Sequence, residues 1–173
     1  MKPERLNEIK KELKSLESAE LVEICLKLAK FKKDNKELLS YLLFEAHDPA
    51  AYTENVKLFL QDSFTTISRN QYQQGKELRK ILRLLNKHIK YVGSVETEIE
   101  LLLWYCSAMI DSGIVRAQQK VAYSIFTRQL EKIRKLTLKL HEDLQFDYLR
   151  ELDRLLLNAE ENIRGFKRRD FGL

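Results

Sequence analysis

The sequence predicts an all-α protein, either a single-domain helical bundle or a stack of α-α hairpins, with seven to eight helices. Apolar residues recur at spacings of three and four along most of the 173 residues, and no pair of segments alternates as strands do. Only five glycines and two prolines interrupt the pattern. Because a chain of this length suits one core, we expect a single helical domain over residues 1–163.

Residues 1–47 are expected to form a compact segment of three helices. The apolar stripe of the first helix consists of Leu6, Ile9, Leu13 and Leu16. Ser18 is expected to cap a second helix, whose apolar face is Leu21, Ile24, Cys25 and Leu28. Asp34 followed by Glu37 resembles a capping box that opens a third helix.

Residues 48–163 are expected to form the main bundle with long C-terminal helices. Asp48-Pro49 marks its start, because proline suits the first helical turn. A fifth helix is expected over about Gln71–Val92, stopped by Gly93, and Ser94 is expected to cap a sixth that ends at Gly113.

The sixth helix is apolar on nearly every side between Ile99 and Ile110, which is typical of the centre of a bundle. From Val115 to about Ile163 the pattern predicts one very long helix or two, with the preferred break at His141–Gln145. Residues 164–173 are expected to be a basic tail.

Catalytic motifs are incomplete throughout the chain. Asp170-Phe171-Gly172 matches the magnesium-binding tripeptide of protein kinases, but the glycine-rich loop and catalytic loop of a kinase do not occur. We therefore expect this tripeptide to be part of a solvated tail. Gly75-Lys76 is followed by Glu77 where a phosphate-binding loop needs serine or threonine.

Metal-binding patterns are incomplete as well. His141-Glu142 opens like a zinc-protease helix, but Gln145 stands in place of the second histidine. None of the three histidines follows a glutamate by three residues, as di-iron bundles require. The sequence therefore predicts no metal site, no cofactor and no particular catalytic residue.

Membrane insertion and export are not expected. The N-terminus is charged throughout, and the longest apolar run falls short of the roughly 20 residues that cross a bilayer. Cys25 and Cys106 each lie on an apolar stripe, so we expect buried free thiols in a reducing cytosol. The expected location is cytoplasmic.

Charge is segregated along the chain, whose net charge is +5. Residues 69–93 carry seven positive and one negative charge, +6, whereas residues 94–113 carry −4. Residues 114–140 again carry seven positive and one negative charge, +6, and residues 141–163 carry two positive and seven negative, −5. Residues 164–173 add four positive and one negative, +3.

A basic band follows one face of the fifth helix, formed by Lys76, Lys80, Arg83, Lys87 and Lys90. Three interpretations are open: a solvated face, a phosphate track for RNA or DNA, or a surface for an acidic protein or membrane. The phosphate track would be aided by the seventh helix, through Arg128, Lys132, Lys135 and Lys139, and by the basic tail. Exposed aromatic side chains for base stacking are not expected within the band.

The stretch "LKSLESAELVEICLKLAKFKKDNKELLSYLLFE", residues 13–45, resembles the N-terminal part of an uncharacterised family of small bacterial helical proteins. The resemblance is carried by the pattern Leu-x-x-Leu-x-x-x-Glu-Leu and by Asn35-Lys36-Glu37-Leu38-Leu39. It implies a bacterial cytosolic protein and assigns no activity or site residue.

The function indicated is a non-enzymatic binding or scaffolding role, with a protein as the expected partner. Nucleic-acid binding through the basic band is the first alternative. An enzyme is the second, since a bundle can build a site from side chains scattered in sequence.

Overall fold

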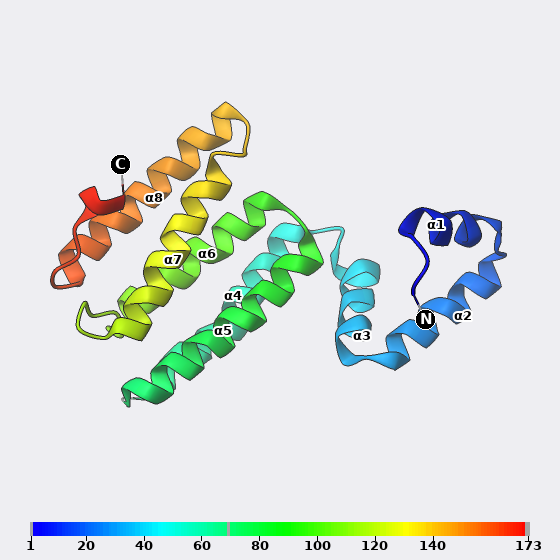
Figure 1. Ribbon diagram of the computed structural model, residues 1–173, viewed down its shortest axis with the longest axis horizontal. Coiled ribbons are helices and arrows are strands. Elements are labelled where there is room, and N and C mark those ends of the chain that lie inside the picture. The colour runs from blue at the N-terminus through cyan, green and yellow to red at the C-terminus, as the bar shows by residue number, and fades with distance from the viewer. Residues whose placement is uncertain (1, 69, 172–173) are drawn as a thin grey trace. The chain divides into compact units, whose positions relative to one another are not determined.

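The computed structural model describes residues 2–68 and 70–171, and within these residues it contains eight α-helices and no strand (Figure 1). The prediction of an all-α helical bundle is therefore confirmed. The chain divides into two compact units, Met1–His47 and Asp48–Leu173. The division falls at Asp48-Pro49, where the sequence predicted the start of the main bundle. These are called the N-terminal unit and the C-terminal unit.

The N-terminal unit contains α1 (Leu6–Ser15), α2 (Ser18–Phe31), α3 (Lys33–Ser40) and a π-helical turn (Tyr41–Glu45). Helix α2 begins one residue earlier than expected, because Glu17 and Glu20 form a reciprocal capping box in place of a Ser18 cap. The expected capping box of Asp34 and Glu37 is wrong: Lys32 is the N-cap of α3 and makes no side-chain cap. Helices α2 and α3 pack against each other.

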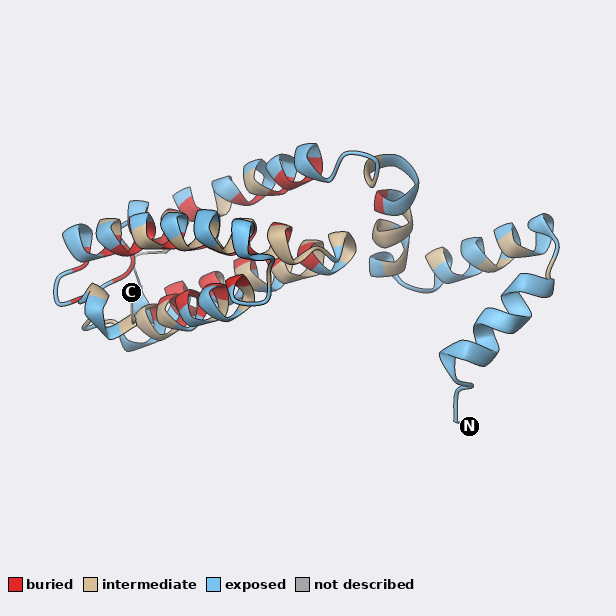
Figure 2. Cartoon of the chain, turned by 90° about the horizontal axis from the view of Figure 1, so that it is seen from above, coloured by how far each residue is buried: buried red, intermediate tan, exposed pale blue. Residues whose placement is uncertain are grey.

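Most apolar side chains of this unit are exposed. Tyr41 is its only buried hydrophobic residue among those described, and α1, α2 and α3 bury none. Figure 2 shows the same contrast, with buried residues throughout α4 to α8 and none in α1 and α2. The three expected helices are present, but the apolar stripe of α1 is not covered.

The C-terminal unit contains five longer helices: α4 (Pro49–Thr65), α5 (Gln71–Val92), α6 (Val95–Asp111), α7 (Lys120–Thr137) and α8 (Glu142–Asn162). A short 3-10 turn, η2 (Arg168–Phe171), follows them. The caps of α4 and α6 agree with the sequence, since Asp48 accepts from the backbone N–H of Ala51 and Ser94 accepts from that of Thr97. Gly93 ends α5 with φ +72°, a conformation that favours glycine.

Helix α6 lies at the centre of this bundle, as its apolar sequence predicted. It packs against α4, α5, α7 and α8. Its fully buried side chains include Ile99, Leu102, Tyr105, Cys106 and Met109. The Tyr105 hydroxyl donates to the backbone carbonyl of Leu78 in α5 at 3.0 Å, so the buried phenol is satisfied.

The last two helices are separate, with a break over residues 138–141. The break lies just before the expected position, and Gln145 is inside α8. Helix α7 starts at Lys120 and not near Val115. At the other end of the bundle, Gly75 allows α5 to approach α7, because a Cβ at this position would lie 2.7 Å from Cγ1 of Val121.

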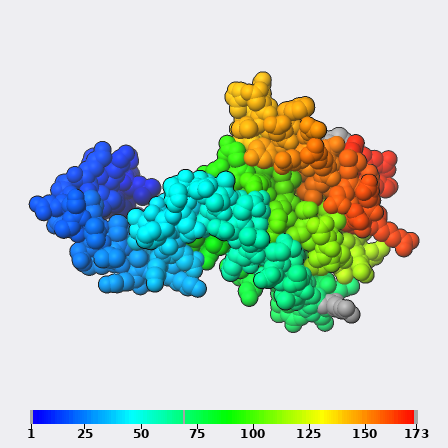
Figure 3. Space-filling model, turned by 180° about the vertical axis from the view of Figure 1, so that it is seen from behind, coloured from blue at the N-terminus to red at the C-terminus, as the bar shows by residue number. Residues whose placement is uncertain are grey.

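The segment after α8 folds back onto the bundle through Phe166, Arg168 and Phe171, whereas the other residues from 164 to 170, Asp170 included, are exposed. Phe166 is buried, and its ring centroid lies 5.9 Å from that of Phe126 and 5.0 Å from that of Phe171. Arg168 forms an ion pair of 3.2 Å with Asp153 of α8. Figure 3 shows this segment in contact with α8. Gly172 lies outside the described residues.

We predict that Phe166→Ala lowers the free energy of unfolding by about 3 kcal/mol, because it removes a buried ring from between α7 and the terminal turn. Urea denaturation followed by circular dichroism measures this change. The matched control is Phe146→Ala on α8, where the ring is 69% exposed and the expected change is below about 0.5 kcal/mol. Equal effects of the two substitutions would contradict the packing of the C-terminal segment.

Candidate functional site

The residues of the basic band predicted on the fifth helix all lie on α5. Asn70 caps this helix by accepting from the backbone N–H groups of Tyr72 and Gln73. The opposite face of α5 is buried in the bundle through Leu78, Ile81, Leu85 and Ile89. Burial of that face turns the band toward solvent along about 21 Å of helix.

Four members of the band are exposed: Lys76, Lys80, Arg83 and Lys90. Within the described part of the chain, none of these four forms an ion pair with a carboxylate. The fifth member, Lys87, is half-buried. The band is therefore a row of cations whose charge is balanced mainly by solvent and counterions.

The structure adds two residues that sequence reasoning missed. Tyr72 precedes Lys76 by four residues, so it lies on the same helix face, and it is 70% exposed. Nζ of Lys76 lies 4.2 Å from the centroid of the Tyr72 ring. Arg79 is also exposed and flanks the band. Tyr72 lies just before the band, and no Phe, Tyr or Trp occurs between Lys76 and Lys90, as the sequence indicated. The spacing of four was the signal that could have found Tyr72.

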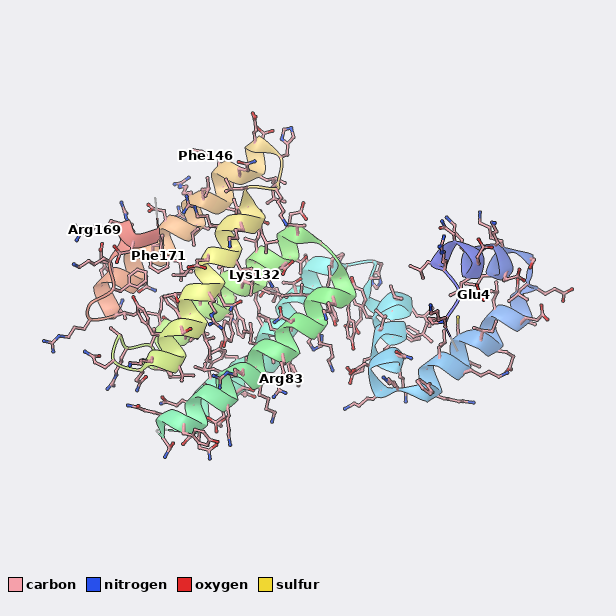
Figure 4. All side chains as sticks on the ribbon, in the orientation of Figure 1. Glu4, Arg83, Lys132, Phe146, Arg169 and Phe171 are labelled. Carbon is pink, nitrogen blue, oxygen red and sulfur yellow. The ribbon has the colours of Figure 1, made fainter. Side chains whose placement is uncertain are left out.

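The basic residues of α7 that were expected to extend the band do so only in part. Nζ of Lys132 lies 3.5 Å from the Asn86 side-chain oxygen of α5, which brings α7 beside the band (Figure 4). However, Lys132 also pairs with Glu98 of α6 at 2.6 Å, so its charge is compensated. Arg128, Lys135 and Lys139 are exposed, and Lys139 lies beyond the end of α7.

A groove of about 530 Å³ lies beside the C-terminal end of the band. Its lining comes from the end of α5, the start of α6 and the middle of α7, and it includes Lys90, Ser94, Glu98 and Lys132. The Ser94 hydroxyl donates to Glu96 at 2.6 Å, and this hydrogen bond lowers the pKa of the Glu96 carboxyl. Because its lining includes Glu98 together with Lys90 and Lys132, the groove carries charges of both signs, in contrast to the band.

A second pocket, of about 650 Å³, lies at the other end of the bundle. It is lined by the end of α4, the start of α5 and the loop between α6 and α7, and it includes Asp111 and Arg116. The buried side-chain oxygens of Gln74 and Gln119 in its wall have no hydrogen-bond partner among the described residues. Among its described lining residues there is no histidine, cysteine or lysine to act as nucleophile or general base.

The ionisable groups with the most strongly raised pKa values lie in the core. Burial raises the pKa of the Cys106 thiol and that of the Tyr105 phenol, because the interior disfavours their charged forms. Neither group lines the pocket or the groove. A thiol that stays protonated is a poor nucleophile, so Cys106 is a packing residue. Cys25 is exposed, which corrects the expectation that both thiols are buried.

Metal ligands do not gather in the described residues, where no three His, Cys, Asp or Glu side chains could hold an ion. His88, one of the three histidines, lies with its Nδ1 atom 2.6 Å from the Tyr52 hydroxyl and joins α5 to α4. None of the helices over the described residues has the length and apolar character needed to cross a membrane.

Comparisons with protein-family models, with curated proteins and with solved structures find no significant match to this chain. Inference about function therefore depends on the surfaces and pockets of this protein alone.

We predict that a maleimide labels one cysteine per chain in the native protein and both in denaturant, because Cys106 is fully buried and Cys25 is exposed. Mass spectrometry of the labelled protein counts the additions. The Cys25→Ser variant should remain unlabelled until it is unfolded. Rapid labelling of that variant under native conditions would contradict the burial of Cys106.

Proposed function

We propose that this chain is a non-enzymatic binding protein of the bacterial cytosol, and that the basic band of α5 binds the phosphate backbone of a nucleic acid. The observation that carries the proposal is the row of four exposed cations without a carboxylate partner. The resemblance of residues 13–45 to a family of small bacterial proteins supports the cellular setting.

The four exposed cations of the band differ from three other cations of the bundle, Lys57, Lys132 and Arg168, which have acidic partners. Lys57 pairs with Glu54 and Glu100; burial disfavours its charge, but these two carboxylates outweigh burial and raise its pKa. Lys132 and Arg168 likewise have acidic partners. Like charges aligned on one rigid helix repel one another, and a polyanion that lies along the helix relieves this repulsion.

The aromatic side chain at the N-terminal end of the band favours a nucleic acid over an acidic protein. Tyr72 presents an exposed ring beside Lys76, and a base of a single strand can stack on such a ring while its phosphates meet the cations. An acidic protein supplies the charge but no base. The arrangement therefore fits single-stranded RNA or DNA better than a duplex, whose bases are already stacked.

We predict that the protein binds labelled single-stranded RNA with an affinity that falls steeply with salt. If four cations each neutralise one phosphate, the slope of log K against log salt is roughly −3, since single strands contribute about −0.7 per contact. Fluorescence anisotropy across a salt series measures the slope. The triple variant Lys80→Glu/Arg83→Glu/Lys90→Glu should abolish binding.

The matched control for this experiment changes the same net charge on another surface. Arg150, Arg154 and Arg164 are exposed and lie on or just after α8, so their triple replacement by glutamate leaves the band intact. Equal loss of binding in the two triple variants would show a general charge effect. Absence of binding at low salt would overturn the proposal and direct attention to protein partners.

We predict that Tyr72→Ala weakens binding of single-stranded RNA by about tenfold, because stacking of one base on an aromatic ring is worth roughly 1–3 kcal/mol. Tyr72→Phe keeps the ring and should retain most of the affinity. Duplex DNA binding should change little in either variant. If Tyr72→Ala left RNA affinity unchanged, the ring would have no part in binding, although the band could still hold phosphates.

A further inference from the structure

The N-terminal unit leaves ten large apolar side chains exposed. They come from α1, α2 and the π-helical turn, and none comes from α3: Leu6, Ile9, Leu13, Val22, Leu26, Leu28, Phe31, Leu42, Leu43 and Phe44. Their exposed fractions run from 37% at Leu13 to 83% at Leu6. In Figure 2 the ribbons of α1 and α2 are coloured as exposed or intermediate throughout.

An exposed surface of this size is unusual for a protein that remains a monomer. Seven of these ten side chains are more than half exposed, and a stable interface takes about 800 Å² from each partner. Isolated apolar residues on a surface need no explanation, but a continuous set on amphipathic helices marks an interaction site.

The charge of the unit favours a second copy of the same chain as the occupant. Residues 1–47 carry ten positive and nine negative charges, so the unit is close to neutral, unlike the basic band. A strongly acidic or basic partner would find no complementary field on it. A peripheral membrane helix would carry mainly lysine and arginine on its polar face, whereas α1 also carries Glu8 and Glu12 there.

The charges that flank the stripe of α1 are arranged for pairing with themselves. At about 100° per residue, Lys10 and Lys14 lie on one side of the stripe, and Glu8 and Glu12 lie on the other. If two copies of α1 pack stripe against stripe in parallel, the two-fold axis places the basic side of one helix next to the acidic side of its partner. The same surface is then complementary to itself in both shape and charge.

We propose that the N-terminal unit is a self-association module that pairs with the same unit of a second chain, through the apolar faces of α1 and α2. This inference is independent of the proposed nucleic-acid binding, since the two surfaces belong to different units. A dimer would present two basic bands to one strand, and a linked second contact raises apparent affinity without any new type of contact.

Sedimentation velocity of the full chain across a concentration series tests the proposal. The expected mass is twice the 20.5 kDa of one chain at high concentration, with dissociation on dilution. The triple variant Leu6→Glu/Leu28→Glu/Phe31→Glu should remain a monomer at every concentration. Its positions are 83%, 55% and 76% exposed, so the substitutions disturb no buried side chain of the unit.

The matched control places the same three charges on exposed apolar positions of the C-terminal unit, as Leu138→Glu/Phe146→Glu/Leu157→Glu. This variant should dimerise as the wild type does. Circular dichroism of both variants checks that helix content is kept. A wild-type protein that stays monomeric at all concentrations overturns the proposal, and so does a control variant that loses dimerisation equally.

A second measurement locates the interface directly. Cys25 on α2 is exposed and Cys106 is buried, so a nitroxide reagent labels one site per chain in the native protein. Pulsed electron resonance should then report a short distance between the labels of two chains. Dimers without that distance would place the contact elsewhere and overturn the assignment to α2. Binding of a monomer to neutral or anionic lipid vesicles would overturn it in favour of a membrane surface.

Discussion

Burial of α6 is the constraint on which the C-terminal unit depends. Between Ile99 and Ile110 most sides of this helix are apolar, so most of its circumference there must be covered by other helices. One neighbouring helix covers only one side, and the bundle therefore needs α4, α5, α7 and α8 around it. The buried hydroxyl of Tyr105 adds a directional contact to α5, since it donates to the Leu78 carbonyl. Each surrounding helix then has one buried face and one face in water.

The position of the basic band follows from that packing. Because the apolar face of α5 must meet α6, the opposite face is held outward along the whole helix. Acidic residues of α6 are committed elsewhere: Glu98 pairs with Lys132 and Glu100 with Lys57. These pairs leave the exposed cations of α5 without carboxylates of their own. The charge segregation along the sequence is thus partly cancelled between helices, while the outer face of α5 keeps its exposed cations.

The ends of helices could be predicted from the sequence where a single residue determines where a helix begins or stops. Proline after Asp48, serine at position 94 and glycine at position 93 each act within one turn, and the structure has all three as expected. Contacts between distant residues were not readable. Phe166 looks like part of a charged tail until Phe126 and Phe171 are seen around it. Tyr72 lies four residues before Lys76, but only the buried face of α5 shows that both side chains are exposed.

The N-terminal unit shows a different limit of sequence reasoning. The periodicity of Leu6, Ile9 and Leu13 predicts that one face of α1 avoids water, but it does not state what covers that face. A bundle can satisfy its apolar stripes within one chain only if enough helices surround them, as happens around α6. Three short helices cannot surround one another in this way, and their stripes stay open. The near-neutral charge of the N-terminal unit is consistent with its proposed self-association. Net charge opposes the association of identical surfaces, and a self-associating surface must therefore balance its own charges, as the flanks of α1 do.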